Sequence, residues 1–549
     1  MRVAAQTALP AAFSWRSYPH PVTGQTVSAV TPARDQFSPQ RTGTCWAHVT
    51  LGALESLTLI DAVAADPGTD PSAPLYDYSE YDLVRCAPRE ERTCINEGRV
   101  ESSVAYLTRA GAVAEACAPL ALCFASSPPG CVEDCPRLVT PLGWEWVGAG
   151  VEDIKEALYH HGPVITPVHT KDTNFFSLAP GAVWYWPGRG DEGLNHGLVI
   201  VGWDDAKEVY DGATLVGRGA WEVKNSNPKW ADQGFGWVAY GSGRIGSFAS
   251  VFTEVQPYDP EEIVYYYDDW GQTGAAGDER PGPEWGLVSF TLRQSGRIQR
   301  VEFWTVSDHT SYKIRLYDQF DGRAPRKLKA SQDGSCGRRG YCSVRLAEPA
   351  EVLVADNIYV AVEFEAPDTA RPVPVDRRGP FAPGRSYLSA DGKTWTPLNN
   401  QDLAIRLRVT PEDSDRDGLP DYWERAYRCM KPKKNDAEDD YDGDGLANID
   451  EYGFARALYG ASTDPCTPDT DADGLPDAWE AQHRACLHPT IPDAPEDPDR
   501  DGASNLQEFS AGTDPCAPLE ATGPRESPED SDYRTEAERL GSELYFKHK

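Results

Sequence analysis

The chain has 549 residues, 40% of them hydrophobic, and this length predicts several domains with buried cores. Its formal net charge is −34, and residues 411–549 hold 35 acidic and 14 basic side chains, so most of the excess lies in the last quarter. Such a surface repels phosphate, which argues against a nucleic-acid partner, and it suits metal cations. No apolar stretch approaches the roughly 18 residues of a membrane span, so no transmembrane segment is expected.

Residues 14–255 mix helical and strand patterns. Residues 45–65 repeat apolar side chains at steps of three and four, which predicts a helix with one buried face that begins at Cys45. Residues 197–203 and 220–226 are short, β-branched and bounded by glycine or polar residues, so they predict strands.

Residues 260–410 have a different pattern, in which apolar and polar residues alternate between turn residues. The alternating segments are GLVSFTL, VEFWTV, YKIRLYD, CSVRLAE, NIYVAVEFE and LAIRLRV. This pattern is typical of an antiparallel β-sandwich.

Residues 411–516 contain an internal repeat. DSDRDGLPDYWE at residue 413 returns as DTDADGLPDAWE at 469, and DYDGDGLANIDE at 440 returns as DPDRDGASNLQE at 497. Short helices are expected after the loops, including one over residues 450–458. The polar, charged residues 517–549 are expected to form a disordered acidic tail.

Each of these four segments places oxygen-bearing side chains at loop positions 1, 3, 5, 9 and 12 and glycine at position 6. This spacing wraps one chain around one Ca²⁺, because the glycine allows a sharp turn and the last glutamate can bind through both oxygens. The alternative is a solvated acidic face, which four complete matches make improbable. We therefore expect up to four structural Ca²⁺ ions. The candidate ligands are Asp413, Asp415, Asp417, Asp421 and Glu424; Asp440, Asp442, Asp444, Asn448 and Glu451; Asp469, Asp471, Asp473, Asp477 and Glu480; and Asp497, Asp499, Asp501, Asn505 and Glu508.

The chain has 13 cysteines, and the twelve other than Cys45 fall in local groups. An even, grouped set predicts disulfides and an oxidising compartment. A zinc site at residues 117–135 is a weaker alternative, because the segment has no paired C-x-x-C units and no histidine. Although the first residues lack the apolar segment of a signal peptide, the expected location is extracellular or at the cell surface.

Three segments resemble, in order, the active-site segments of papain-family cysteine peptidases. They are VTPARDQFSPQRTGTCWAHVTLGALES, LNHGLVIVGWDD and WEVKNSNPKWADQGFGWVAYG. The resemblance covers residues 11–255 and implies an α+β peptidase domain with two lobes and no cofactor for catalysis.

The resemblance assigns roles that the chemistry supports. Cys45 is the expected nucleophile, because a helix N-terminus and a nearby imidazolium both favour a thiolate. His196 is the expected base and then acid, and Asn225 would orient its ring. Gln36 and the Cys45 backbone N–H would form the oxyanion hole. The family pattern also places Gly98 and Trp46 at the substrate.

The sequence departs from the family pattern near the nucleophile. Gln36 lies nine residues before Cys45 instead of six, so Gln40 is an alternative oxyanion donor. His48 is a rival base, although packing or lining of the cleft is the favoured interpretation. The family tryptophan after the Asn-Ser pair is replaced by Asn227, so Trp230 or Trp237 is expected to shield the Asn–His contact.

Two further resemblances concern the remaining chain. YYYDDWGQT and PGRSYLSADGKTWTPL resemble the lectin-like β-sandwich that follows some bacterial and archaeal papain-type peptidases, which implies a glycan or cell-surface ligand for residues 260–410. Residues 411–516 resemble bacterial thrombospondin type 3 repeats, in which such loops form a calcium-loaded stalk. A dockerin-like module that fixes the enzyme to a scaffold is the alternative for these repeats.

The sequence thus predicts a multidomain secreted or surface cysteine endopeptidase that hydrolyses protein or peptide substrates through an acyl-enzyme. Residues 165–186 are the expected wall of its substrate pocket. The alternative is a papain-like scaffold with weak catalysis that acts as an adhesin or as a glycan- or protein-binding protein.

Overall fold

The computed structural model describes the chain from residue 9 to residue 517. The described part omits 21, 39, 89–92, 96–97, 133–134, 171–172, 189–192, 367–368, 453–461 and 484–485. The chain separates into two compact units, residues 1–437 and 438–549. The predicted disordered tail, residues 517–549, lies outside the described residues from 518 onward.

The central helix of the first unit is α1 (Cys45–Ala65), which begins at the predicted residue. By length and composition alone it could cross a membrane, but most of it is buried inside the protein. Leu51, Leu54 and Leu57 are almost fully buried, so α1 is a core helix. The sequence predicted one buried face for this helix, but α1 is buried on several sides.

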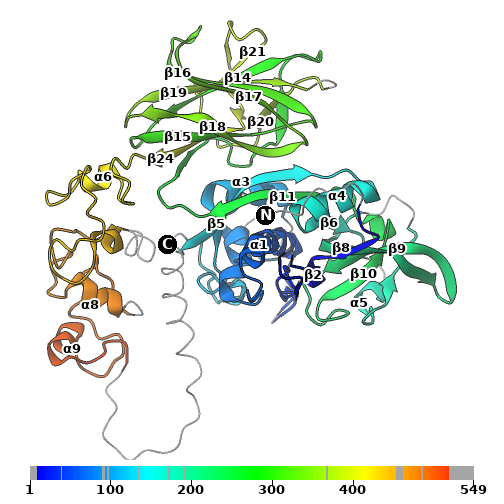
Figure 1. Ribbon diagram of the computed structural model, residues 1–549, viewed down its shortest axis with the longest axis horizontal. Coiled ribbons are helices and arrows are strands. Elements are labelled where there is room, and N and C mark those ends of the chain that lie inside the picture. The colour runs from blue at the N-terminus through cyan, green and yellow to red at the C-terminus, as the bar shows by residue number, and fades with distance from the viewer. Residues whose placement is uncertain are drawn as a thin grey trace, which may run out of the picture. The chain divides into compact units, whose positions relative to one another are not determined.

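Strands and further helices surround α1 (Figure 1). The strands are β1 (Ala12–Ser14), β2 (Tyr18–Pro19), β3 (Thr26–Val27), β4 (Ala112–Val113), β5 (Arg137–Trp146), β6 (Val164–Val168), β7 (Val183–Trp184), β8 (His196–Asp211), β9 (Thr214–Lys224), β10 (Phe235–Ala239) and β11 (Ser250–Pro257). The helices are α2 (Glu80–Cys86), α3 (Val100–Ala110), α4 (Val151–His161) and α5 (Thr173–Phe176). The predicted strands at 197–203 and 220–226 correspond to β8 and β9.

The predicted antiparallel β-sandwich follows. Its strands are β12 (Ile263–Tyr265), β13 (Gly274–Ala276), β14 (Glu284–Thr291), β15 (Gly296–Trp304), β16 (Thr310–Phe320), β17 (Pro325–Cys336), β18 (Gly340–Val352), β19 (Asn357–Glu365), β20 (Val373–Asp376), β21 (Ser386–Ser389), β22 (Thr396–Pro397), β23 (Asp402–Leu403) and β24 (Ile405–Pro411). In Figure 1 the sheet with β14, β16 and β19 faces the sheet with β15, β18 and β24. Side chains such as Phe290, Phe303 and Val360 fill the core between them.

One sheet runs without interruption from the sandwich into the papain-like region. Its order is β12-β24-β15-β18-β5-β11-β6-β8-β9-β10-β7, and the two regions join where β18 pairs antiparallel with β5. Gly340 faces Glu145 in this register, and Tyr341 faces Trp144. The β-sandwich and the papain-like region therefore share backbone hydrogen bonding.

The repeats carry short helices. These are α6 (Asp421–Glu424), α8 (Asp477–Gln482) and α9 (Asn505–Ala511), and each begins at the ninth residue of an acidic loop. Residues 448–452 are also helical, from the ninth residue of the second loop, and the rest of the helix predicted over residues 450–458 lies outside the described residues.

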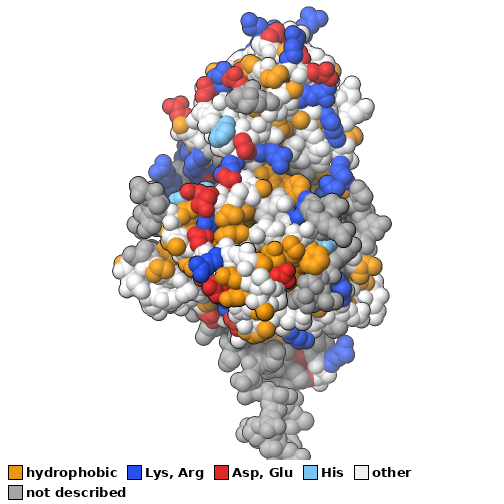
Figure 2. Space-filling model, turned by 90° about the vertical axis from the view of Figure 1, so that its right-hand side faces the viewer, with side chains coloured by type: hydrophobic (Ala, Val, Ile, Leu, Met, Phe, Trp, Pro, Cys, Tyr) orange, Lys and Arg blue, Asp and Glu red, His pale blue; other side chains and the backbone are white. Residues whose placement is uncertain are grey.

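Acidic and basic side chains are interspersed among apolar ones on the face shown in Figure 2.

The junction of β5 and β18 requires a glycine. A Cβ atom on Gly340 would lie 2.0 Å from the Trp144 carbonyl oxygen and 2.8 Å from Glu145 Cα, whereas one on Gly337 meets nothing within 4 Å. We expect Gly340→Ala to lower the free energy of unfolding by about 1–3 kcal/mol, because backbone must move. Gly337→Ala, in the same turn, should change it little. Urea denaturation measures both, and equal stability of the two variants would contradict the close packing.

Candidate active site and acidic loops

Cys45 is the first residue of α1, and Thr44 precedes it as the N-cap residue. Backbone N–H groups at a helix N-terminus have no partner within the helix and carry a partial positive charge. A thiol at this position is therefore favoured as thiolate. Cys45 keeps its thiol, whereas the other cysteines are disulfide-bonded.

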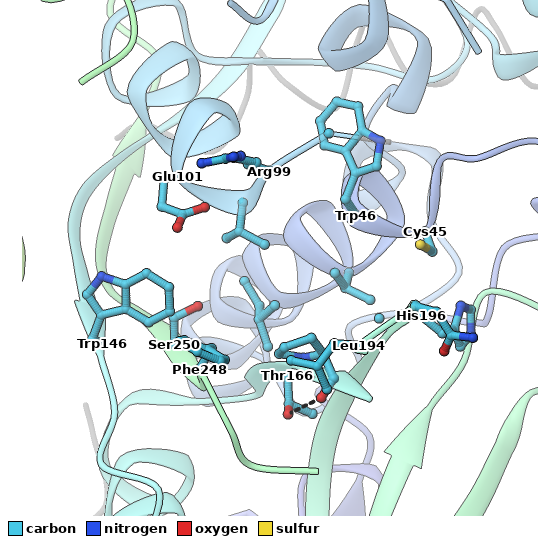
Figure 3. A pocket seen from close by; sticks show the side chains of 17 residues that line it. Cys45, Trp46, Arg99, Glu101, Trp146, Thr166, Leu194, His196, Phe248 and Ser250 are labelled. Atoms are coloured by element: carbon cyan, nitrogen blue, oxygen red, sulfur yellow. Dashed lines mark hydrogen bonds between the residues drawn. The ribbon is translucent and has the colours of Figure 1, made fainter. Parts of the chain in front are cut away.

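His196 and Asn225 meet because β8 and β9 are paired strands. His196 begins β8, Asn225 follows the last residue of β9, and Val199 pairs with Lys224. His196 Nε2 lies 2.8 Å from Asn225 Oδ1. Since an amide oxygen only accepts, Nε2 carries the proton and Nδ1 remains for exchange with a thiol. Figure 3 shows Cys45 and His196 next to each other at one end of a pocket.

Burial and hydrogen bonding act on His196 in opposite directions. Desolvation lowers its pKa to about 4, while the hydrogen bond with Asn225 favours the charged ring. Aromatic rings cover this pair: Phe175 lies 6.1 Å from the His196 ring, and Trp230 lies 5.0 Å from Phe175. Trp230 Nε1–H also donates to the Phe175 carbonyl. Trp230 thus shields the histidine through Phe175, which the sequence did not single out.

The pocket beside Cys45 has a volume of about 600 Å³. Its walls come from α1, from α3 and the residues before it, from the end of β5, from β6, and from the loops before β8 and β11. The lining residues are Cys45, Trp46, Val49, Gly98, Arg99, Val100, Glu101, Trp146, Ile165, Thr166, Pro167, Leu194, Asn195, His196, Gly197, Phe248 and Ser250. Of the described residues in the wall predicted at 165–186, only residues 165–167 line the pocket.

The other predicted site residues have different positions. Gly98 and Trp46 line the pocket, and a Cβ atom on Gly98 would lie 2.3 Å from the Trp46 ring. Gln36 is buried, and its amide donates weakly to the Thr42 carbonyl at 3.4 Å while accepting from Ser226 Oγ. Gln36 and Gln40 are both absent from the residues that line this pocket, and Gln40 is exposed.

His48 faces away from the pocket. Its Nδ1 lies 2.9 Å from the Thr44 carbonyl oxygen, and its Nε2 lies 3.6 Å from the Glu80 carboxylate. Desolvation lowers its pKa to about 4. His48 lines a small internal cavity with Glu55, Glu80 and Lys224, so packing is its role in this geometry.

The four acidic loops share one backbone geometry. The glycine at position 6 has φ between 97° and 109° in every loop, in the region that favours glycine. Position 4 is also left-handed, at Arg416, Gly443, Ala472 and Arg500. The first aspartate of each loop accepts a hydrogen bond from the backbone N–H of the sixth residue. Carboxylates at positions 1, 3 and 5 lie close together in the first three loops.

The glutamate at position 12 is fully buried in each loop, at Glu424, Glu451, Glu480 and Glu508. Each has at least one buried carboxylate oxygen without a hydrogen-bond partner among the described residues, and Glu424 and Glu480 have two. Desolvation, followed by repulsion from neighbouring aspartates, raises the pKa of Glu424 to about 8 and that of Glu480 to about 9. A buried carboxylate without a partner is costly, so this geometry fits a cation.

The two aspartates at position 9, Asp421 and Asp477, have hydrogen-bond partners within their own loops. The Asp421 carboxylate accepts from the backbone and hydroxyl of Ser414, and the Asp477 carboxylate accepts from those of Thr470. These aspartates therefore close their own loops. Asp493, which the spacing does not include, instead groups with Asp473 and Glu480 of the third loop.

The comparisons with known proteins agree with the catalytic geometry. The family described as "Papain family cysteine protease" matches residues 9–253, which include Cys45, His196 and Asn225. The chain carries a papain-family cysteine peptidase domain. The family described as "Lectin like domain" matches residues 264–407, within the β-sandwich.

Curated relatives of the peptidase domain are distant. A cathepsin L-like peptidase of Aedes aegypti is 28% identical over 38% of this chain and 55% of its own length. Vignain of Vigna mungo is 27% identical over 41% of this chain and 53% of its own length. The chain thus spans about half the length of these relatives.

A solved structure extends the likeness of fold beyond the peptidase domain. The cysteine protease and lectin-like domains of Cwp84, a surface layer associated protein of Clostridium difficile, superpose with a TM-score of 0.60 at 18% identity. The match covers 75% of this chain and 91% of that structure. The order of a papain-like fold followed by a lectin-like β-sandwich is therefore shared.

Disulfides confirm the prediction from cysteine grouping and exclude the zinc alternative at residues 117–135. The peptidase domain contains Cys86–Cys131, Cys94–Cys123 and Cys117–Cys135. Cys336–Cys342 lies in the β-sandwich, and Cys486–Cys516 lies in the repeats.

The hydrogen bond between His196 and Asn225 should control the reactivity of Cys45. Removing it in Asn225→Ala lowers the pKa of His196, which reduces the imidazolium that stabilises the thiolate. We expect alkylation of Cys45 by iodoacetamide at pH 6, without reductant, to slow about tenfold, the change given by one pKa unit. Asn227→Ala is the matched control, since Asn227 caps a nearby turn. Equal alkylation rates in the two variants would contradict this role for Asn225.

Proposed function

We propose that this protein is a cysteine endopeptidase. The observation that carries the proposal is the position of Cys45 at the N-terminus of α1, beside a His196–Asn225 pair at the end of a 600 Å³ pocket. These groups supply a nucleophile, a base and an orienting amide within one cleft. A protein or peptide is the proposed substrate, because the pocket of about 600 Å³ beside Cys45 and His196 has room for an amino-acid side chain.

The reaction follows from these groups. The Cys45 thiolate attacks the carbonyl carbon of the scissile bond, and the carbonyl oxygen becomes an oxyanion near the backbone N–H groups of the helix N-terminus. The C–N bond then breaks, and the leaving amine takes a proton from His196. In the second half, His196 removes a proton from water, and the resulting hydroxide displaces Cys45 from the thioester.

A binding protein with weak catalysis is the second candidate. The position of Gln36 favours it, because the buried amide of Gln36 is engaged by Thr42 and Ser226 outside the pocket wall. In the peptidase proposal, Gln36 must change its hydrogen bonds to reach an oxyanion, or the backbone N–H of Cys45 acts without it.

Turnover distinguishes the two candidates. We expect the wild-type chain to hydrolyse members of a fluorogenic peptide library in calcium and mild reductant, and Cys45→Ala to lose about 10³-fold or more of that activity. His48→Phe is the control, because His48 faces the internal cavity and should retain most activity. A folded wild-type protein without turnover would favour the binding protein.

We also propose that the acidic loops hold Ca²⁺, whose positive charge would neutralise the buried glutamates. Asp413, Asp415, Asp417 and Glu424 would hold the first ion. The other three ions would be held by the corresponding residues of the second, third and fourth loops: Asp440, Asp442, Asp444, Asn448 and Glu451; Asp469, Asp471, Asp473 and Glu480; and Asp497, Asp499, Asp501, Asn505 and Glu508. Support comes from the buried carboxylate oxygens without partners in all four loops. In this proposal Asp493 is a further ligand of the third ion. Asp421 and Asp477 instead stabilise their own loops through hydrogen bonds with Ser414 and Thr470.

Calcium titration tests this assignment. We expect Asp493→Asn to weaken one class of site about tenfold in calorimetry, because affinity follows the charge of the ligand set. Glu496→Gln is the matched control, since Glu496 is exposed and only three residues away. The Cys45→Ala background prevents self-cleavage. Identical titrations of both variants would remove Asp493 from the ligand set, and absence of binding by the parent protein would contradict the calcium proposal.

The proposed location is extracellular or at the cell surface. The disulfides support an oxidising compartment, and the Cwp84 structure is that of a surface layer associated protein. The lectin-like domain is the proposed contact with a glycan or another surface ligand. The calcium-loaded repeats would serve as a stalk.

A further inference from the structure

The wall of the substrate pocket farthest from Cys45 belongs to Trp146, the last residue of β5 (Figure 3). Its ring lies 6.4 Å from the ring of Phe248 in an edge-on arrangement. Phe248 is 60% exposed, so it offers little support to the wall. The orientation of Trp146 therefore depends on what lies on its other side.

That other side is the β-sandwich. The Trp146 backbone N–H donates to the Arg339 carbonyl at 2.8 Å, and the Arg339 guanidinium carbon lies 5.0 Å from the centre of the Trp146 ring. A guanidinium over an indole face is attracted by the ring's electron density. Arg339 thus holds the Trp146 backbone and its side chain.

A row of aromatic rings continues this support. Trp144 lies 5.0 Å from Trp146 and 5.8 Å from Trp304 of β15, and Trp304 lies 5.3 Å from Tyr341 of β18. Trp144, Trp304 and Tyr341 are almost fully buried. The ring that bounds the pocket is therefore packed, through Trp144, on the core of the neighbouring domain.

The segment that presents Arg339 is itself held in place. It connects β17 to β18, and the Cys336–Cys342 disulfide spans it. The Arg339 backbone N–H donates to Asp308 Oδ1 at 2.8 Å. The turn has few ways to move, so the position of Arg339 is well defined.

We propose that the β-sandwich completes the substrate pocket of the peptidase domain. Arg339 is a positioning residue that orients Trp146, and Trp146 selects substrates with a large apolar side chain at the residue that enters this pocket. The inference rests on the proposed peptidase function for its biological use. Its physical content, a preference in peptide binding, is independent of turnover.

Peptide binding to the full chain with Cys45→Ala tests the proposal. The probes are fluorescein-labelled alanine-based hexapeptides with one phenylalanine placed at successive positions, measured by anisotropy. We expect the best phenylalanine position to bind more tightly than the all-alanine peptide. Arg339→Gln, which keeps a polar but shorter side chain and removes the charge, should reduce this preference about threefold to fivefold. Arg339→Lys should largely restore it.

Arg338→Ala is the matched control. Arg338 pairs with Asp153 across the same junction at 3.5 Å, so its loss weakens the junction and leaves the Trp146 contacts in place. The preference should stay unchanged in this variant. A preference that survives in Arg339→Gln, falls equally in Arg338→Ala, or is missing in the parent protein overturns the inference. If the phenylalanine preference is retained but the wild-type protein, which has Cys45, shows no turnover, the result contradicts the peptidase proposal alone.

Discussion

The buried guanidinium of Arg406 joins the peptidase domain to the β-sandwich. Arg406 is fully buried in β24, and its Nε donates to both oxygens of Asp268 at 2.9 and 3.0 Å. Its Nη1 donates to the Ala105 carbonyl and the Thr108 hydroxyl of α3. A charge removed from water is stable only when such partners replace the water, and breaking a buried pair costs about 3–5 kcal/mol. The first turn of α3 lines the substrate pocket, so the arginine that fixes its last turns also bears on the cleft.

A second set of buried charges lies behind the catalytic residues. Lys224, which precedes Asn225, donates to Thr31 Oγ1 at 2.7 Å and lies 3.6 Å from the Glu55 carboxylate. Desolvation lowers the pKa of Lys224 and raises that of Glu80 to about 8. Because these groups have partners only in one arrangement, they restrict the backbone that presents Asn225 to His196.

The sequence was sufficient to predict the features that depend on residues close to one another in the chain. The helix that begins at Cys45, the strand that begins at His196, the alternating strands of the sandwich and the glycine turns of the acidic loops all follow from short-range patterns. Residues brought together over long separations could not be found in this way. The pairing of β5 with β18 joins segments about 200 residues apart, and the sequence pattern of neither strand indicates which strand it will pair with. Trp146 gains its place from such contacts, as does the covering ring of Phe175. Asp493 lies close in sequence to the third loop but falls outside the ligand spacing of that loop. Asp421 and Asp477 fit the spacing of ligands, but neighbouring hydroxyl and N–H groups satisfy their carboxylates.

The left-handed residue at position 4 gives the four acidic loops unequal intrinsic preferences. Arg416, Ala472 and Arg500 adopt φ values of 64°, 60° and 64°, while the second loop has Gly443 at φ 80°. A side chain in this region costs about 1 kcal/mol that glycine avoids. The unbound ensemble of the second loop therefore contains more of the closed form than those of its three neighbours. The acidic side chains at positions 1, 3, 5 and 12 are the same in all four loops. The second loop is nevertheless expected to close most readily, because its residue at position 4 is a glycine.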